Sequence, residues 1–261
     1  MDDFKRNDLL SVELERLVLA HRVLQMEGHE DLTLGHMSWR DADGRGFWMK
    51  LQGLALGEIR TAEDLVLLDF DGNVLEGDGR WLHAEWPLHP GVYRARDDVM
   101  AVGHTHPFYS CAFSSTNEPL KCVAHEGAFF GGNVPHFNDT SDLINSRELA
   151  DAMAQTMDDA NGVFIRNHGV TFCGHSIQHA TLMGIFLEKA CRHQILMDSS
   201  GMAWTTVPPD EIVRKQQWLK PEILEASWRF YCRKLKTLEA AHPSPPVSAD
   251  ERIAPWLERF D

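Results

Sequence analysis

The stretch that decides the fold runs from Leu82-His83-Ala84-Glu85-Trp86-Pro87-Leu88-His89 to Gly103-His104-Thr105-His106-Pro107. Its second part follows the apolar residues Met100-Ala101-Val102, a run that is typical of a buried strand. Side chains alternate between the two faces of an extended segment, so His104 and His106 point to the same side. Local geometry alone therefore places two imidazoles together.

A third imidazole stands far along the chain in Asn167-His168-Gly169, a turn sequence between two β-type runs, Val163-Phe164-Ile165 and Val170-Thr171-Phe172. A catalytic divalent-metal site needs about three protein ligands and an open position, so His168 is the predicted third ligand. The chain has 14 histidines, and a single histidine is more often a hydrogen-bonded structural residue than a ligand. The nearby acid Glu85, added to the three imidazoles, favours a metal site.

These residues, in their order along the chain, resemble the class II aldolase/adducin family and within it the L-fuculose-phosphate-aldolase-like proteins. The matching positions extend from about Glu13 to about Met197 and are Glu85, His89, Tyr93, Gly103-His104-Thr105-His106-Pro107, Asn167-His168-Gly169 and Phe186-Leu187-Glu188-Lys189-Ala190-Cys191.

The resemblance implies a three-layer α/β/α fold with a central, mainly antiparallel sheet, assembled as a cyclic homotetramer with sites at subunit interfaces. It also implies a divalent metal on His104, His106 and His168, with Glu85 as the acid/base group. Zinc is the preferred metal, and manganese, iron and cobalt are alternatives because all of them accept imidazole. Related aldolases carry a proton donor for the neighbouring subunit's site near Cys122–Gly127, where His125 is the candidate here. A structural role for His125 is the alternative.

Composition limits the classes of partner. The formal net charge of −14 argues against nucleic acid and against anionic membrane surfaces, whose binding needs basic protein surface. The charged N-terminus predicts neither a signal peptide nor a membrane span. The five cysteines lack a Cys-x-x-Cys pair, which fits reduced thiols and a cytoplasmic protein.

We expect one domain over residues 1–241 and a linker-like tail over residues 242–261, beginning at His242-Pro243-Ser244-Pro245-Pro246. Ser11 is predicted to cap a first helix that ends near Gly28. Pro87 is predicted in the first turn of a helix that runs to Arg96, with Glu85 at its N-terminal end. His89 and Tyr93, further along this helix, are expected to serve in packing more than in the site.

Other elements follow from periodicity and turn composition. We expect two β-hairpins, a short helix after the His-x-His pair, a long buried helix and two amphipathic helices that offer apolar surface for subunit contact or a lid. The ranges are Leu32–Arg40 with Phe47–Lys50, Leu65–Phe70 with Val74–Leu75, Pro107–Ala112, Ile177–Ile195, Asp210–Leu219 and Pro221–Ala240. On the long helix, His179, Glu188 and His193 are expected to be solvent-facing or ion-paired. His136 and His175 are weaker candidates for the site.

The chain departs from the sugar-phosphate aldolases it resembles. Those enzymes seat phosphate on small hydroxyl and amide side chains, and the matching stretches here are Gly35-His36, Gln52-Gly53 and His83-Ala84. A sugar phosphate is therefore disfavoured. Three tryptophans in the same segments, Trp48, Trp81 and Trp86, point weakly to a flat or apolar substrate, although a core or interface role is the common fate of a tryptophan.

The leading hypothesis is a metal-dependent lyase that decarboxylates a hydroxylated, catechol-type aromatic acid through an enolate, as in aromatic compound catabolism. Glu85 or His125 would protonate the carbanion, and the substrate would be a small acidic molecule. Its carboxylate would need a local cation, for which Arg40, Arg60 and Arg166 are candidates. Three alternatives stay open: an aldolase for a non-phosphorylated hydroxy or keto acid, an oxygen-consuming iron enzyme, and a non-catalytic adducin-like interaction module.

Overall fold

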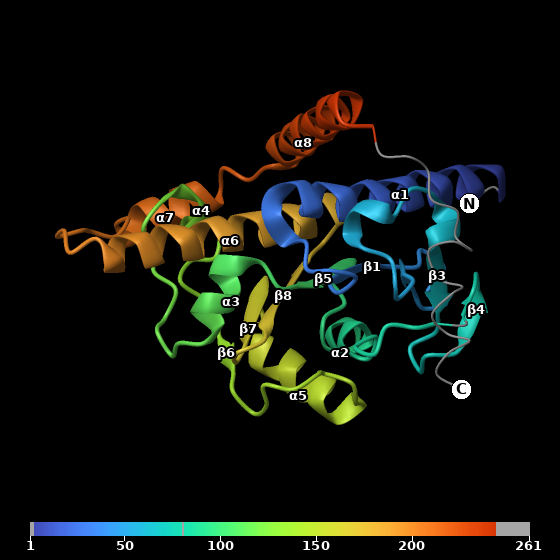
Figure 1. The fold of residues 1–261 in the computed structure, drawn as a ribbon, viewed down its shortest axis with the longest axis horizontal. Helices are drawn as coiled ribbons and strands as arrows, with labels where there is room; N and C mark the ends of the chain where they lie inside the picture. Colours follow the sequence, from blue (N-terminus) through green and yellow to red (C-terminus); the bar gives the residue numbers. More distant parts are fainter. Residues whose placement is uncertain (1–2, 80, 244–261) are drawn as a thin grey trace.

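The computed structural model describes residues 3–79 and 81–243, and its centre is a single eight-stranded sheet (Figure 1). The strand order is β4-β3-β2-β1-β5-β8-β7-β6. All neighbouring strands are antiparallel except β6 and β7, which are parallel. The strand bounds are β1 His36–Arg40, β2 Phe47–Lys50, β3 Leu65–Leu68, β4 Val74–Glu76, β5 Ala101–Thr105, β6 His136–Phe137, β7 Gly162–Ile165 and β8 Gly169–Gly174.

Helices cover both faces of the sheet, which confirms the predicted α/β/α layering (Figure 1). One face carries α1 and α6, with α8 lying over both. The other face carries α2 and α5, while α3 packs against α6 and the β7–β8 end of the sheet. The helix bounds are α1 Asp3–Leu24, α2 Leu88–Ala95, α3 Phe108–Ser114, α4 His125–Ala128, α5 Arg147–Met157, α6 Ile177–Ser199, α7 Pro209–Gln216 and α8 Pro221–Ala241. Three short helical turns complete the set: η1 Gln25–His29, η2 Leu56–Glu58 and η3 Ala62–Asp64.

Most strands are buried because helices lie on both faces. Every residue of β2, β3, β5, β7 and β8 is buried, and β3 and β7 read as continuous apolar runs, whereas the edge strand β4 is exposed. Both predicted hairpins are present, with β1 paired to β2 and β3 paired to β4. The β1–β2 turn is closed by Asp41, whose amide donates to Gly46 O at 2.9 Å.

Two helix starts differ from their predictions. Ser11 lies inside α1, which begins at Asp3, because residues 3–10 hold neither glycine nor proline to stop a helix. Pro87 is the N-terminal cap of α2, not a member of its first turn. Glu85 therefore precedes the helix in a turn, where its carboxylate is free to face the sheet.

The two C-terminal helices also differ in part from their predictions. Trp228 and Tyr231 of α8 are buried, so they hold this helix on the protein, whereas Phe230 and Trp218 are about half exposed. The predicted tail lies almost wholly outside the described residues, and the domain boundary at residue 241 stays a prediction. No helix in the described ranges has the length and apolar character needed to span a bilayer.

A buried histidine ties α1 to β1. His21 is fully buried, its Nδ1 donates to Leu17 O at 2.7 Å, and its Nε2 accepts from the Met37 amide at 3.2 Å. Both ring nitrogens are thus used in the neutral state, and burial lowers the pKa of His21 from 6.5 to about 3.

We predict that this histidine destabilises the fold in acid. Below pH 6.5 the unfolded chain takes up a proton that folded His21 does not, so the free energy of unfolding falls by about 1.4 kcal/mol per pH unit from this group until the folded pKa is reached. Urea unfolding at about pH 7.5 and 5.5 measures the loss. In His21→Gln, the fall in the free energy of unfolding between these two pH values should be smaller by the part that one proton contributes. An unchanged pH dependence in the variant would refute the assignment to His21.

Candidate metal centre

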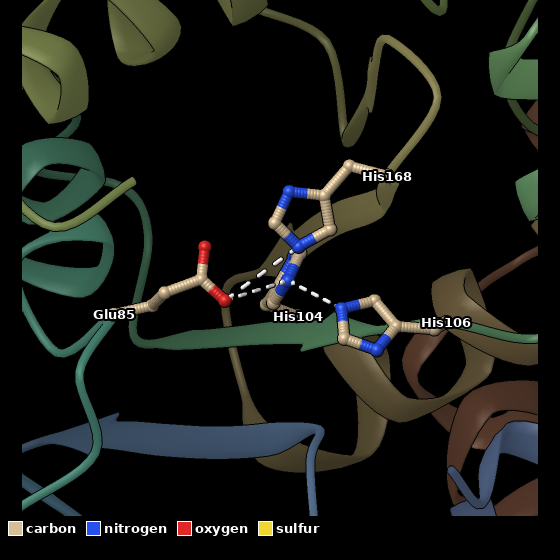
Figure 2. Close-up of side chains that lie close together, drawn as sticks. All are labelled: Glu85, His104, His106 and His168. Carbon is tan, nitrogen blue, oxygen red and sulfur yellow. Dashed lines mark hydrogen bonds and ion pairs between the residues drawn. The ribbon is translucent and has the colours of Figure 1, made fainter. Parts of the chain in front are cut away.

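Four side chains from different parts of the chain meet at one end of the central strands (Figure 2). His104 lies in β5, His106 follows that strand, and His168 stands in the turn between β7 and β8. Glu85 comes from the turn before α2. Their nearest ligand atoms all lie within 4.8 Å of one another. The four residues predicted from the sequence for the metal site and its acid are thus brought together.

The imidazoles face one another through the same ring atom. Nε2 of His106 lies 3.0 Å from Nε2 of His104, and Glu85 Oε2 lies 3.4 Å from Nε2 of His104 and 3.6 Å from Nε2 of His168. Figure 2 shows the three rings and the carboxylate pointing into a common space. Asn167, in the left-handed region with φ of 55°, helps to make the sharp turn that carries His168.

The other ring nitrogens settle the tautomers. Nδ1 of His104 lies 3.1 Å from Val170 O, Nδ1 of His168 lies 3.3 Å from Asp142 O, and Nδ1 of His106 lies 3.0 Å from Asp31 Oδ2. A carbonyl or carboxylate oxygen only accepts, so we assign the proton of each neutral ring to Nδ1. All three Nε2 lone pairs then converge on one point.

This arrangement suits a divalent cation. Two Nε2 lone pairs 3.0 Å apart cannot hydrogen-bond to each other and repel, whereas a cation between them would bind both. Burial, followed by the neighbouring His104 and His168, lowers the pKa of His106 to about 4. Burial also lowers the pKa of His168. Both rings are neutral near pH 7, which is the form that binds metal.

Glu85 is anchored through one oxygen and presents the other. Its Oε1 accepts from the Ile144 amide at 2.8 Å, and the side chain is buried. Burial raises the pKa of this carboxyl, but the neighbouring His104 and His168 and the hydrogen bond from the Ile144 amide lower it more, so the pKa lies below its ordinary value. Glu85 is a carboxylate, and Oε2 is the oxygen that faces the imidazoles.

A buried polar chain supports the face of the sheet behind His104. In register, His36 of β1 pairs with His104 of β5. From His36 Nδ1 the chain runs to His89 Nε2 at 2.6 Å, from His89 Nδ1 to Ser38 Oγ at 2.6 Å and on to the Tyr93 hydroxyl at 2.7 Å. His89 and Tyr93 therefore belong to a hydrogen-bonded network behind the site and do more than fill space.

Large side chains stand in and near the stretches expected to correspond to the phosphate seat of related aldolases. The His36 and His83 rings lie 4.1 Å apart, centroid to centroid. Lys50 is fully buried, and its Nζ donates to Thr33 O at 2.9 Å, Leu51 O at 3.4 Å and Leu54 O at 2.6 Å. Burial lowers the pKa of this ammonium to about 7. Its three donors are already used by backbone carbonyls.

A cavity of about 820 Å³ is lined by three of the four cluster residues, Glu85, His106 and His168, while His104 is fully buried beside them. Its apolar lining includes Leu34, Phe108 and Leu143, which are 39%, 77% and 41% exposed. Acidic residues also line it: Glu30, Asp31, Glu85 and Asp142. Among the described residues no lysine or arginine does so. An anionic substrate would therefore depend on the metal, or on a neighbouring chain, for its positive charge.

The three arginines predicted to meet a substrate carboxylate lie elsewhere. Arg40 donates to Tyr93 O, Arg96 O and Val99 O and stacks on the Tyr93 ring. Arg60 pairs with Glu239 at 2.6 Å. Arg166 is exposed and is not among the residues that line the cavity.

The predicted tryptophans do not face the cavity. Trp48 is buried and donates to Asp41 Oδ1 at 3.2 Å. Trp81 packs over Gly53, and Trp86 packs over Gly72. These rings fill space around tight turns, so they give no support for an aromatic substrate. The apolar side chains that do line the cavity were not recognised from the sequence.

The remaining histidine candidates lie apart from the cluster. His125 begins α4 and packs against Phe129 and Trp218 beside a separate hollow of about 280 Å³. His136 stacks on Phe113 and Phe164, and the His175 ring lies against His179.

Glu188 has a different role from the predicted one. Its carboxylate accepts from the Tyr109 amide at 2.9 Å and from the Ser110 amide and hydroxyl, each at 2.7 Å. These groups lie in the first turn of α3, directly after His106 and Pro107. Glu188 therefore fixes the start of α3; it is partly buried, and no basic side chain of the described residues forms an ion pair with it.

Comparison with known proteins agrees with this geometry. The family described as Class II Aldolase and Adducin N-terminal domain matches residues 15–195. The chain belongs to this family. It is 32% identical over 213 residues to a 3,4-dihydroxyphthalate decarboxylase of Arthrobacter keyseri, covering 76% of this chain and 84% of that one.

Two other relatives are named as aldolases. A 5-deoxy-D-ribulose 1-phosphate aldolase of Bacillus thuringiensis serovar kurstaki is 31% identical over 207 residues, which is 78% of this chain and 93% of that one. The structure of L-fuculose 1-phosphate aldolase from Glaciozyma antarctica PI12 superposes with a TM-score of 0.77 at 26% identity and covers 90% of this chain and 92% of that one. Membership of the family and the four-residue cluster support a divalent-metal-dependent lyase.

Gly169 has no room for a side chain. A methyl group there would lie 2.6 Å from Cδ2 of His106 and 2.7 Å from Thr105 O. We predict that Gly169→Ala displaces the His106 ring and lowers metal affinity by roughly tenfold or more, the scale expected when the support of a metal ligand is lost.

Chelator competition measures this affinity, and Gly162→Ala is the matched control. Its methyl would approach the flexible end of Leu187 at 3.3 Å and touch no predicted ligand. Equal affinities in the two variants would contradict the steric argument.

Proposed function

We propose that the protein is a divalent-metal-dependent carboxy-lyase that acts on a hydroxylated aromatic acid. The observation that carries the proposal is the convergence of three Nε2 lone pairs, from His104, His106 and His168, beside a buried carboxylate. Three neutral imidazoles leave the cation its full charge and an open position for substrate. When bound, it supplies Lewis acidity to adjacent oxygens of the substrate.

Zinc is the proposed metal, because three imidazoles with an open position are a frequent zinc site in enzymes. Manganese, iron and cobalt accept the same ligands. The neutral tautomers, set by Val170 O, Asp142 O and Asp31, serve any of these cations.

Glu85 is the proposed acid/base group. The Ile144 amide holds Oε1 at 2.8 Å, so Oε2 remains as the oxygen that takes a proton from the substrate or returns one. Its buried position next to His104 and His168 supports this role, because general acid–base catalysis requires the group to lie within reach of the reacting atoms.

An apolar, flat substrate is supported by the cavity lining. Leu34, Phe108 and Leu143 stand exposed around the opening, and exposed apolar side chains of this size mark binding surface. A polyhydroxylated sugar would leave them unused. The relative named 3,4-dihydroxyphthalate decarboxylase, at 32% identity, supports the same class of substrate.

A homotetramer with sites at subunit interfaces remains part of the proposal. The cavity opens to the outside and leaves Phe108 77% exposed, and no lysine or arginine of the described residues lines it. A neighbouring subunit would complete such a site. We propose His125, which borders a second hollow with Trp218 and Arg214, as the proton donor to a neighbour's cavity.

The first prediction for this function concerns the metal and the reaction together. The purified protein should hold close to one divalent ion per chain, and metal-loaded protein should release carbon dioxide from an ortho-dihydroxybenzoic or dihydroxyphthalic acid. His168→Ala should lose the metal, because one of three ligands is gone. Glu85→Gln should keep the metal and lose about 10²–10⁴-fold in turnover, the usual contribution of an acid/base group.

The other outcomes separate the alternatives. Metal without carbon dioxide release, but with pyruvate or glycolaldehyde from hydroxy or keto acids, would replace the carboxy-lyase with an aldolase. Oxygen uptake by an iron-loaded protein would indicate oxidative chemistry. Metal well below one ion per chain, unchanged in His168→Ala, would favour a non-catalytic interaction module.

A second prediction tests the shared site. If His125 serves a neighbouring chain, Glu85→Gln and His125→Ala are each inactive alone, but dissociated and reassembled mixtures regain activity because some cavities then receive intact residues from both chains. The measurement is turnover against mixing ratio. Mixtures no more active than the separate variants, with assembly verified by native mass, would exclude His125 from a shared site.

A further inference from the structure

The three imidazoles of the cluster are held by different kinds of hydrogen-bond acceptor. His104 and His168 donate from Nδ1 to backbone carbonyls, Val170 O and Asp142 O. His106 donates to a side chain, Asp31 Oδ2, at 3.0 Å. A substitution cannot remove a carbonyl from the chain, but it can remove a carboxylate. The orientation of His106 thus depends on a separate residue.

Asp31 belongs to a short segment that runs beside the His-x-His pair. His29 Nδ1 lies 2.9 Å from the Thr105 hydroxyl, and Asp31 contacts His106, so alternate residues of one segment meet successive residues of the other. Glu30 between them is extended, with φ of −74° and ψ of 132°. We call residues 29–31 the bracket.

The residues just before the bracket are tied to two helices. Gly28, with φ of +91°, interrupts the helical conformation inside η1, and the Glu27 side chain just before it is 9% exposed. The Glu27 carboxylate pairs with Lys189 of α6 at 3.9 Å and also with Lys234 of α8. These ion pairs tie the chain four residues before Asp31 to α6 and α8, and the Asp31 side chain itself is 40% exposed at the cavity.

We propose that Asp31 is a positioning residue that fixes the ring orientation and tautomer of His106. The inference rests on the proposed metal site. A carboxylate acceptor holds Nδ1–H more strongly than a carbonyl does and makes Nε2 a better electron-pair donor. Asp31 is not a ligand itself, because its carboxylate meets the far side of the His106 ring and lies outside the four-residue cluster.

The alternative is that Asp31 acts only through the negative charge of the cavity. Glu30 tests this, since it carries the same charge, lines the same cavity and makes its bond to Gln25, at 2.8 Å, and not to an imidazole. Removing the charge of Glu30 changes the field at the site without touching His106.

The experiment measures zinc affinity by chelator competition, at one pH and ionic strength, for the wild type, Asp31→Ala, Asp31→Asn, Glu30→Gln and His106→Ala. We expect Asp31→Ala to lose roughly 10–100-fold in affinity. Asp31→Asn should lose less, because its amide oxygen still accepts from Nδ1, and Glu30→Gln should stay within about threefold of the wild type. Thermal unfolding of the metal-free proteins verifies that each variant is folded.

Each outcome has a separate meaning. If the wild type binds zinc and both Asp31→Ala and Glu30→Gln bind it with the wild-type affinity, Asp31 has no positioning role and the metal site stands. Losses of the same size in Glu30→Gln and Asp31→Ala would replace positioning with cavity charge. No zinc binding by the wild type, or none lost in His106→Ala, would remove the metal site and this inference with it. If Asp31→Ala does not fold, the Asp31→Asn comparison decides.

Discussion

The site depends on three hydrogen bonds that point away from it. Each imidazole of the cluster gives its Nδ1 proton to an oxygen behind it, and this leaves every Nε2 lone pair facing inward. Two of the oxygens are backbone carbonyls, Val170 O in β8 for His104 and Asp142 O in the loop between β6 and α5 for His168. The antiparallel pairing of β5 with β8, which sets His104 opposite Thr171, is what brings these two histidines together.

Behind the three imidazoles, several polar side chains are buried. His36, Ser38, His89 and Tyr93 are all buried and joined by short hydrogen bonds, and Lys50 is buried on three carbonyls nearby. Such groups are costly to bury unless they are paired. Their pairing ties β1 to α2, because His36 and Ser38 of β1 bond to His89 and Tyr93 of α2. The network therefore holds the floor of the site in one position.

Much of the fold could be read from the sequence because its signals are local. The period-two spacing of His104 and His106, the Asn167-His168-Gly169 turn and the apolar runs around them required no distant information, and the structure brings the three histidines and Glu85 together. The hairpins followed from turn composition. The start of α1 was predicted too late. Serine is a frequent N-terminal cap, and nothing in residues 3–10 marks the earlier start at Asp3.

What could not be read were partners set by tertiary contact. Asp31 lies 75 residues from His106 in sequence, in a loop with no periodic signal, and nothing local marks it as a partner of an imidazole. Glu188 on α6 looked like a surface acid, although it holds the first turn of α3. The tryptophans near Glu85 suggested a substrate surface, but they pack over glycines in turns. Composition near a motif is a poor guide to which side chains line its cavity.

The separation of the four cluster residues along the chain has a consequence for folding. Glu85 precedes β5, His104 and His106 belong to its end, and His168 arrives only with the β7–β8 turn, so no partly folded segment contains a complete set. A cation would then bind the native state and scarcely bind the unfolded chain. Mass action would add RT ln(1 + [L]/Kd) to the free energy of unfolding, and the supply of metal in the cell would help to determine how much of this protein survives quality control.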